Sequence, residues 1–326
     1  MQSPAALATP PATAPRPREL ESSNHLLGDR AALDAAWERN GYWFFRDVLD
    51  RGAIARLRAV YMQLLGEYGV ADPADPAARY NGASLEGFPF RMDPLSKRKA
   101  WQPFVREPAI HAFFRHLLQD EPFWIPTVEY RATPPAAERT RSRLDFVHQD
   151  GFYNKGIPFR ICWIPLAEID DEVGGLMLGE GLHRGPILHD TTQPPLYPIP
   201  EGAVPAARWR RTTYRPGDVL LMDLNTPHTG LANHSDRFRL SMDIRVMGAK
   251  DDPPMVGRLT VVEAHAVELE GEDGRGGRFV VDDASYCRGL DGQQVPLADI
   301  ATRFHVGDEV IVAARDGRAT IMRPIH

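Results

Sequence analysis

Two histidines and one aspartate have the residue types and the spacing that a metal site needs. His148 and Asp150 are separated by one residue, and His228 follows far downstream. Residues two apart in a β-strand point to the same face, so His148 and Asp150 can reach one metal ion from the end of one strand. Two imidazoles and one carboxylate form the ligand set of non-haem Fe(II) oxygenases, and they leave coordination positions open for a co-substrate and O2.

A second His-x-Asp pattern, His234-Ser235-Asp236, competes for this role. The first pattern follows residues 144–147 and precedes residues 151–153, as expected where a strand runs into a loop. The second lies in the polar stretch 231–237, which contains turn-forming residues and favours a solvated loop. The surroundings therefore favour His148 and Asp150 as the ligands.

The distal ligand candidate, His228, follows the short apolar run 219–222, which has the length of a buried strand. A histidine in this position could also cap that strand through a hydrogen bond. The alternating segment 238–246 comes next and places Arg239 and Ser241 on one strand face. A guanidinium and a hydroxyl together can hold a carboxylate, the guanidinium through two hydrogen bonds. This pair suits the far carboxylate of 2-oxoglutarate.

In these motifs the chain resembles the phytanoyl-CoA dioxygenase-like family of Fe(II)/2-oxoglutarate-dependent oxygenases. The resemblance extends over roughly residues 30–248. It also rests on Asn40-Gly41-Tyr42-Trp43 and on segments 44–49, 54–58, 161–166, 170–176, 181–185 and 216–218. It implies that His148, Asp150 and His228 hold Fe(II). It also implies that Arg239, eleven residues after His228, binds 2-oxoglutarate.

The resemblance implies further co-substrate contacts, and the chain departs from the family pattern at two places. Gln149 and Trp163 fit positions near 2-oxoglutarate, although a tryptophan in a strand is also typical of a core. Tyr130 and Arg131 are the two candidates for a polar contact upstream of the metal motif. The family often has Gly-Ser after the distal histidine, whereas this chain has Thr229-Gly230, which puts a serine contact in doubt. It has Glu180-Gly181-Leu182-His183 where Pro-Gly-Ser-His is common, so His183 is interpreted as a structural loop residue.

The resemblance implies an oxidation coupled to conversion of 2-oxoglutarate to succinate and CO2. Because the carboxylate ligand is retained, halogenation is disfavoured, and hydroxylation of a C–H bond is the default. Desaturation, epimerisation and ring closure remain alternatives. Two other classes of protein stay open. The first is a metal-dependent hydrolase, and Arg239 after the distal histidine argues against it. The second is a non-catalytic cupin-like binding protein, and the complete set of three ligands argues against that.

Composition is consistent with an enzyme that acts on a small molecule. The chain has 326 residues, 43% of them hydrophobic, enough for one large domain and a small addition. A net charge of −6 does not indicate binding to nucleic acid or to a membrane surface. Two cysteines, Cys162 and Cys287, predict a reducing compartment and a cytoplasmic location. We expect no transmembrane segment and no signal peptide, and we allow for a homo-oligomer.

The pattern of elements predicts a mainly β fold with flanking helices. Residues 1–18 are rich in Ala, Pro and Thr and predict a disordered tail. Residues 19–250 predict the oxygenase domain, with helices first and then a double-stranded β-helix (jelly-roll, cupin-like) core. Within it, 71–91 predicts a long loop beside the substrate pocket, and the proline-dense stretch 189–209 predicts either a lid or a simple insertion. Residues 251–326 predict a small β-rich appendage that supplies no contact to iron or 2-oxoglutarate.

The sequence leaves the substrate open. Arg139, Arg141 and Arg143 alternate before the metal motif, where they suit an anionic substrate or a solvated edge strand. The other polar candidates are Asn154, Lys155 and Arg160. No long basic tract indicates a nucleotide carrier, so a polar small molecule is favoured over a fatty acyl-CoA. A natural-product intermediate or a modified amino acid would fit.

Overall fold

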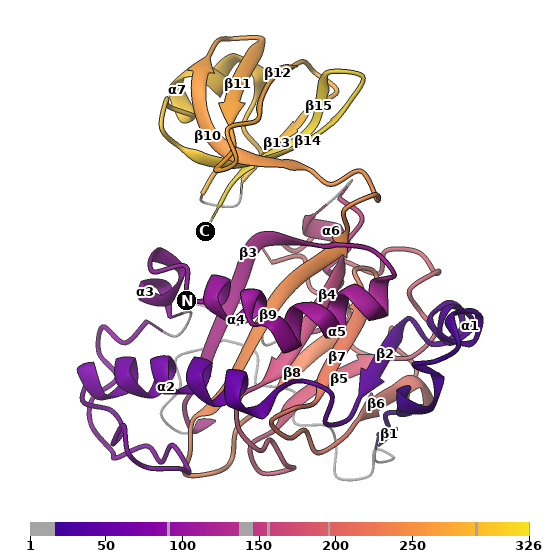
Figure 1. Ribbon diagram of the computed structural model, residues 1–326, viewed down its shortest axis with the longest axis vertical. Helices are drawn as coiled ribbons and strands as arrows, with labels where there is room; N and C mark the ends of the chain where they lie inside the picture. The colour runs from indigo at the N-terminus through magenta and orange to yellow at the C-terminus, as the bar shows by residue number, and fades with distance from the viewer. Residues whose placement is uncertain are drawn as a thin grey trace.

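The computed structural model describes residues 17–89, 92–136, 146–154, 157–194, 196–290 and 293–325 (Figure 1). Most of the predicted tail, the arginines at 139, 141 and 143, and Lys155 therefore lie outside the described residues. At the predicted boundary, Arg18 is part of strand β1 (Arg18–Glu19), which pairs in parallel with β6 (Trp209–Arg211). Arg18, the last residue of the predicted tail, is therefore part of a strand.

Two sheets form the core of the larger domain. The five-stranded sheet has the order β2-β7-β4-β9-β3, and all its pairings are antiparallel. The four-stranded sheet has the order β1-β6-β5-β8. The remaining strands of the two sheets are β2 (Tyr42–Phe45), β3 (Pro122–Thr133), β4 (Arg160–Pro165), β5 (Gly175–Gly179), β7 (Val219–Asp223), β8 (His228–Leu231) and β9 (Arg239–Gly248). This arrangement confirms the mainly β, jelly-roll prediction.

Helices cover the outer face of the five-stranded sheet (Figure 1). They are α1 (Arg30–Asn40), α2 (Arg51–Glu67), α3 (Asp93–Lys97), α4 (Trp101–Arg106) and α5 (Pro108–Leu118). The side chain of Asp50 caps α2 by accepting a hydrogen bond from Ala53 N at 2.7 Å. The buried face of α2 includes Ile54, Leu57 and Tyr61, at the spacing of an amphipathic helix.

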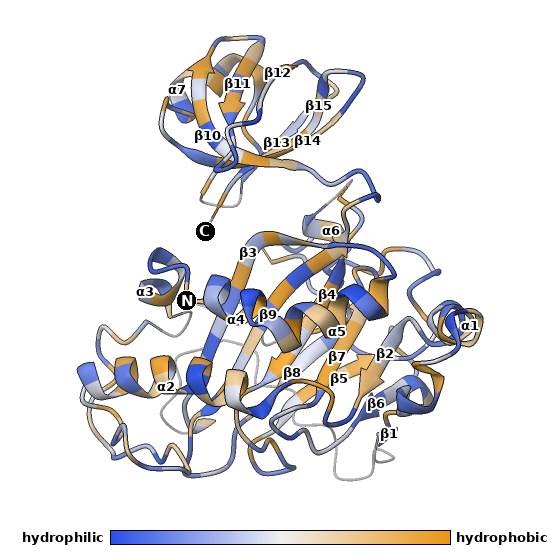
Figure 2. Cartoon of the chain, viewed as in Figure 1, coloured by the Kyte–Doolittle hydropathy of each residue, from blue (hydrophilic) through white to orange (hydrophobic). Residues whose placement is uncertain are grey.

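Alternation along β9 separates an outer apolar face from an inner polar face. Leu240, Met242, Ile244 and Val246 belong to the core beneath the helices. The intervening residues, which include Arg239, Ser241, Asp243 and Arg245, therefore point into the barrel. Hydrophobic residues concentrate on the strands, whereas the helices show mixed hydropathy (Figure 2). A strand with arginine and aspartate on its inner face is what a polar site inside the barrel requires.

The C-terminal residues form a second β unit with its own core. Its sheet has the order β12-β11-β10-β14-β15-β13, and an additional pairing joins β12 to β15. Its elements are β10 (Met255–Val262), β11 (Ala266–Glu270), β12 (Gly276–Val280), β13 (Tyr286–Cys287), α7 (Ile300–Arg303), β14 (Glu309–Arg315) and β15 (Arg318–Pro324). Ile311 and Ile321 from this unit belong to the same apolar cluster as Ile125 and Met247 of the barrel. The unit therefore packs on the end of the barrel.

In the described part of the chain, no helix has both the length and the apolar character that crossing a membrane would require.

Candidate active site

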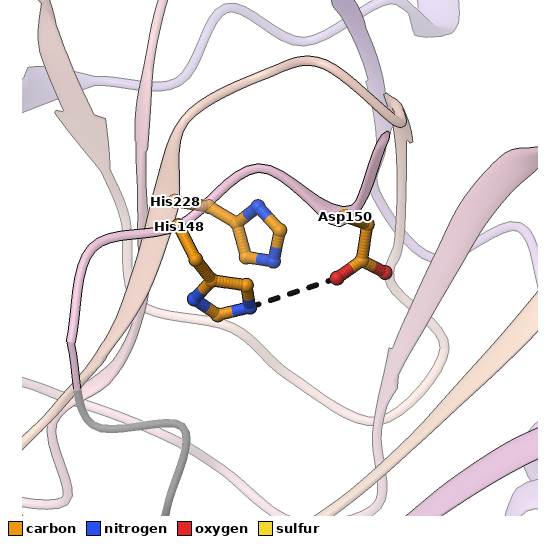
Figure 3. A group of neighbouring side chains, drawn as sticks. All are labelled: His148, Asp150 and His228. Atoms are coloured by element: carbon orange, nitrogen blue, oxygen red, sulfur yellow. Dashed lines mark ion pairs between the residues drawn. The ribbon is translucent and has the colours of Figure 1, made fainter. Parts of the chain in front are cut away.

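The three predicted ligands come together inside the barrel (Figure 3). His148 and His228 exchange two backbone hydrogen bonds, of 3.0 and 2.9 Å, so a bridge between their segments sets them side by side. Their ring centroids are 4.3 Å apart. Asp150 begins the short helix α6 (Asp150–Tyr153), and its Oδ1 lies 3.6 Å from His148 Nε2. The potential ligand atoms all lie within 4.8 Å of one another.

Hydrogen bonds fix the tautomer of both histidines. His148 Nδ1 lies 2.9 Å from the carbonyl of Phe146, and His228 Nδ1 lies 2.9 Å from the carbonyl of Thr226. A carbonyl only accepts, so each Nδ1 carries the proton and each Nε2 keeps its lone pair. Burial, together with the neighbouring His228, lowers the pKa of His148 to about 3. The imidazole therefore stays neutral, as a metal ligand must be.

Asp150 is buried but ionised. Burial opposes ionisation, yet the neighbouring groups, above all the charge of Arg245, together outweigh it, and the pKa of Asp150 falls to about 2. Arg245 Nη2 donates to Asp150 Oδ2 at 3.1 Å, and Arg245 Nη1 donates to the carbonyl of Thr127 at 2.9 Å. Two neutral imidazoles and one carboxylate in this arrangement fit a divalent transition metal of the non-haem iron type.

Arg239 and Ser241 lie on the inner face of β9, as the alternation predicts. Arg239 is 5% exposed and donates to the carbonyl of Leu231 at 2.5 Å. Ser241 is 1% exposed, and its Oγ has no hydrogen-bond partner among the described residues. A buried hydroxyl without a partner is costly unless a ligand completes it, so this strand face suits a bound carboxylate. Arg237 instead pairs with Asp170 at 2.9 Å near the surface.

Gln149 does not face the metal ligands, which corrects its expected place near 2-oxoglutarate. Its Oε1 accepts from Leu188 N at 2.8 Å, and its Nε2 donates to the carbonyl of Asn225 at 2.8 Å. The side chain is fully buried. Because successive residues of an extended segment point to opposite sides, the residue between His148 and Asp150 points away from both.

The same alternation corrects Tyr130. Its ring belongs to the core beneath the helices, and its hydroxyl accepts from Trp101 N at 2.9 Å. Its neighbour Arg131, the other candidate, points into the barrel and lies 3.7 Å from both Glu129 and Asp243. Of the two, Arg131 is therefore the one placed toward the site.

Trp163 lies on the inner face of β4 and packs edge-on against Tyr214, with ring centroids 4.6 Å apart. The Tyr214 hydroxyl donates to the carbonyl of Leu176, on strand β5. No direct contact between Trp163 and the three ligands is observed among the described residues. Its place fits a packed wall of the barrel as well as a neighbour of 2-oxoglutarate.

Other sequence candidates lie away from the ligands. His234 and Asp236 are exposed on a turn, and His183 packs against Gly41. Arg160 lies over the rings of Trp37 and Trp43, which corrects its expected place near the substrate: β4 turns this residue toward the helices. His265 and His305 are both exposed in the C-terminal unit.

Sequence reasoning missed two residues that support the ligands. Arg245 lies six positions after Arg239, so the alternation of β9 was a sufficient signal for its inward orientation. The other residue, His189, accepts a hydrogen bond from Gln149 N on its Nε2 at 2.8 Å, and its ring stacks on Phe152 at 4.2 Å. No local pattern marks His189, because its contacts depend on how the proline-dense loop folds back.

The proline-dense loop is attached to the segment that carries the ligands. Ile199 N donates to the carbonyl of Val147 at 3.0 Å, and the Tyr153 hydroxyl donates to the carbonyl of Leu196. With the contacts of Gln149 and His189, these bonds cover the outer side of the ligand segment. The loop is thus built into the wall of the site.

The chain is similar to several known proteins. The family profile described as phytanoyl-CoA dioxygenase (PhyH) matches residues 37–241. The 1-deoxypentalenic acid 11-beta-hydroxylase of Streptomyces arenae is 30% identical over 249 residues, covering 69% of this chain and 83% of that protein. The same enzyme of Streptomyces exfoliatus is 29% identical over 241 residues, with the same coverage of both chains. The crystal structure of EvdO2 from Micromonospora carbonacea var. aurantiaca with 2-oxoglutarate superposes with a TM-score of 0.49 at 20% identity, covering 72% of this chain and 94% of that one.

The fold brings together the three candidate metal ligands that were predicted from the resemblance to this family. His148, Asp150 and His228 form a buried group that could hold a metal ion, and Arg239 stands on an inner strand face. The family match spans more than half of the chain and contains all four residues. This chain belongs to the phytanoyl-CoA dioxygenase family and is an Fe(II)- and 2-oxoglutarate-dependent dioxygenase.

Proposed function

We propose that this enzyme hydroxylates a C–H bond of a polar small molecule, an intermediate of natural-product biosynthesis. The observation that carries the proposal is the buried ligand set in a chain whose relatives are hydroxylases named for a carboxylic acid substrate. The small-molecule substrate and O2 are what this family of dioxygenases uses. The identity of the substrate is the open part of the proposal.

Each residue of the site has a proposed role. Nε2 of His148, Nε2 of His228 and a carboxylate oxygen of Asp150 would hold Fe(II). When bound, the metal supplies the activation of O2 that is coupled to loss of CO2 from 2-oxoglutarate. Arg239 would pair with the far carboxylate of 2-oxoglutarate, and Ser241 Oγ would donate to it.

The inner wall supports a polar substrate. Glu129, Arg131 and Asp243 point into the barrel, and their side chains remain 14%, 19% and 14% exposed. Burial raises the pKa of Asp243 despite the nearby arginines, and its Oδ1 has no partner among the described residues. A few polar groups on the wall of a protein cavity are suited to orient a bound polar molecule, and Asp243 Oδ1 is available for such a contact.

The test measures succinate formation by the full chain supplied with Fe(II), 2-oxoglutarate and O2. Candidate substrates are screened by mass spectrometry, with 1-deoxypentalenic acid included as a probe. Hydroxylation adds one oxygen atom to the substrate, desaturation removes two hydrogens, and epimerisation leaves the mass unchanged. If succinate formed together with a product of unchanged or reduced mass, the reaction would be epimerisation or desaturation and not hydroxylation. A chain that bound neither metal nor 2-oxoglutarate would overturn the proposal as a whole.

We further propose a cytoplasmic enzyme with a domain boundary near residue 250. Cys162 and Cys287 are both free and buried, which suits a reducing compartment. The separate core of the C-terminal unit supports the boundary. The proposal also allows for self-association of the chain as a homo-oligomer. Light scattering of the purified chain measures the oligomeric state.

A further inference from the structure

The C-terminal unit reaches the helix that begins with Asp150. Arg323, on β15, donates from Nη1 to Asn154 Oδ1. Asn154 donates from Nδ2 to the backbone carbonyl of Asp150 at 2.9 Å. Arg288 donates from Nη1 to the carbonyl of Tyr153 at 3.4 Å. Two arginines of this unit thus contact α6, one through the Asn154 side chain and one through the backbone of Tyr153.

The contact of Arg323 is buried. Arg323 is 5% exposed and Asn154 is 9% exposed. Burial and the nearby charges of Arg288 and Arg245 lower the pKa of Arg323 to about 9. Within the described ranges, Arg323 forms no ion pair with a carboxylate, and its Nε has no hydrogen-bond partner. Burying a guanidinium beside two other arginines is costly, so apolar packing alone does not account for its position.

Apolar contacts explain why the unit can hold this position. Ile311 and Ile321 of the C-terminal unit share a cluster with Ile125, Ile157 and Met247 at the end of the barrel. Lys99, before α4, also pairs with Glu272 at 2.8 Å and with Glu309 at 3.2 Å in the C-terminal unit. These contacts fix the distance between β15 and α6. Arg323 can therefore transmit the position of the unit to the helix that presents Asp150.

We propose that Arg323 is a positioning residue for the metal centre, acting through Asn154 on the backbone of Asp150. The inference rests on the proposed metal-binding role of His148, Asp150 and His228. It is compatible with the prediction that the C-terminal region supplies no contact to iron or 2-oxoglutarate, because Arg323 would orient a ligand without being one. The family match ends at residue 241, so this support is an addition that the matched region does not contain.

The test compares the affinity of full-length variants for Mn(II), a stable substitute for Fe(II), by isothermal titration calorimetry. Arg323→Met keeps much of the side-chain volume but removes the hydrogen bonds. We expect its Kd for Mn(II) to rise about 10- to 100-fold, the usual effect of removing a group that orients a ligand. Arg318→Met, on the same strand but half exposed and paired with Asp282, is the matched control and should bind Mn(II) like the parent chain.

A second variant tests the same contact from the barrel side and can be used if Arg323→Met does not fold. Asn154→Ala changes only the barrel side of the contact and should weaken Mn(II) binding to a similar extent. The double variant should bind no more weakly than the weaker single variant, because both remove one pathway. Circular dichroism confirms the fold, and hydrogen exchange of residues 150–154 should speed up in each variant. Folded variants with a Kd within twofold of the parent would overturn the inference, whereas a parent chain that does not bind Mn(II) would overturn the metal centre itself.

Discussion

Arg245 and Asp150 form a buried ion pair in which each group has a second task. Arg245 Nη2 lies 3.1 Å from Asp150 Oδ2, while Asp150 Oδ1 lies 3.6 Å from His148 Nε2. The carboxylate therefore gives one oxygen to the guanidinium and leaves the other available for a metal ion. Carboxylate ligands held by a hydrogen-bonded partner keep their orientation, and such partners strongly affect metal affinity.

Replacement of Arg245 by methionine should weaken metal binding. The change leaves a buried carboxylate without its ion-pair partner and frees it to rotate. We expect the Kd for Mn(II) to rise about 10- to 100-fold, and stability to fall by about 3–5 kcal/mol. Calorimetry and urea unfolding measure the two effects. Arg258→Met, an exposed arginine paired with Glu309, is the control, and an equal loss of metal affinity in that variant would contradict the assigned role.

Replacement of His148 by alanine should abolish turnover without unfolding the chain. The variant loses one of three ligands, so succinate formation should fall below detection and metal content after dialysis should drop. The matched control is His234→Ala, in the other His-x-Asp pattern, whose side chain is exposed. Metal content by mass spectrometry and succinate by chromatography are the measurements. Stoichiometric iron with full activity in His148→Ala would remove His148 from the ligand set.

Replacement of Arg239 by alanine should raise the apparent KM for 2-oxoglutarate and leave metal binding nearly unchanged. A lost charge-assisted contact of this kind is worth about 2–5 kcal/mol, which corresponds to an increase in KM of about 30-fold to several thousand-fold. Arg237→Ala serves as the control because Arg237 already pairs with Asp170 near the surface. A larger change in KM for Arg237→Ala would reverse the assignment.

Replacement of Gln149 by alanine should reduce stability but not the binding of 2-oxoglutarate. The Gln149 amide joins Leu188 and Asn225 and does not face the metal ligands. Its removal leaves buried backbone groups unpaired, at a cost of about 1–3 kcal/mol. Thermal unfolding and the KM for 2-oxoglutarate distinguish a structural role of Gln149 from a role in binding 2-oxoglutarate. A KM raised tenfold in a variant of unchanged Tm would restore Gln149 as a co-substrate contact.

Metal-free protein should lose part of its stability in acid through Asp150. Arg245 holds the pKa of Asp150 at about 2, below its ordinary value of 3.8, although burial acts in the opposite direction. A lowered pKa contributes stability that is present above pH 4 and is lost as the pH falls from about 4 through 2. The shift corresponds to on the order of 2 kcal/mol.

Asp150→Asn removes this contribution. With metal chelated, urea unfolding should show a parent chain that is more stable than the variant at pH 5, and the difference should shrink toward pH 3. A difference that stayed constant over this range would show that Asp150 is not held ionised by Arg245.

The sequence by itself predicted the candidate ligands and the side of the strands on which they lie. Alternation within a strand is a local property, so the inward orientation of Arg239 and Ser241 follows from their spacing alone. Asp150 begins a helix, and it lies near His148 because Gln149 between them is extended. Applied consistently, the same rule also turns Gln149 and Tyr130 away from the site. The jelly-roll core follows from short strands separated by turns, which identify the fold class but not the pairing of distant strands.

Only the tertiary structure decided which distant groups support those ligands. The inward orientation of Arg245 could be predicted from the alternation of β9. Its pairing with Asp150 depends on where the tertiary structure places α6 relative to β9. His189 and Arg323 come from a loop and from a separate β unit, and both contact the ligand segment across long stretches of chain. Such contacts depend on packing between elements, which leaves no periodic signal in the sequence, because any side chain of suitable size and polarity could have filled the same place.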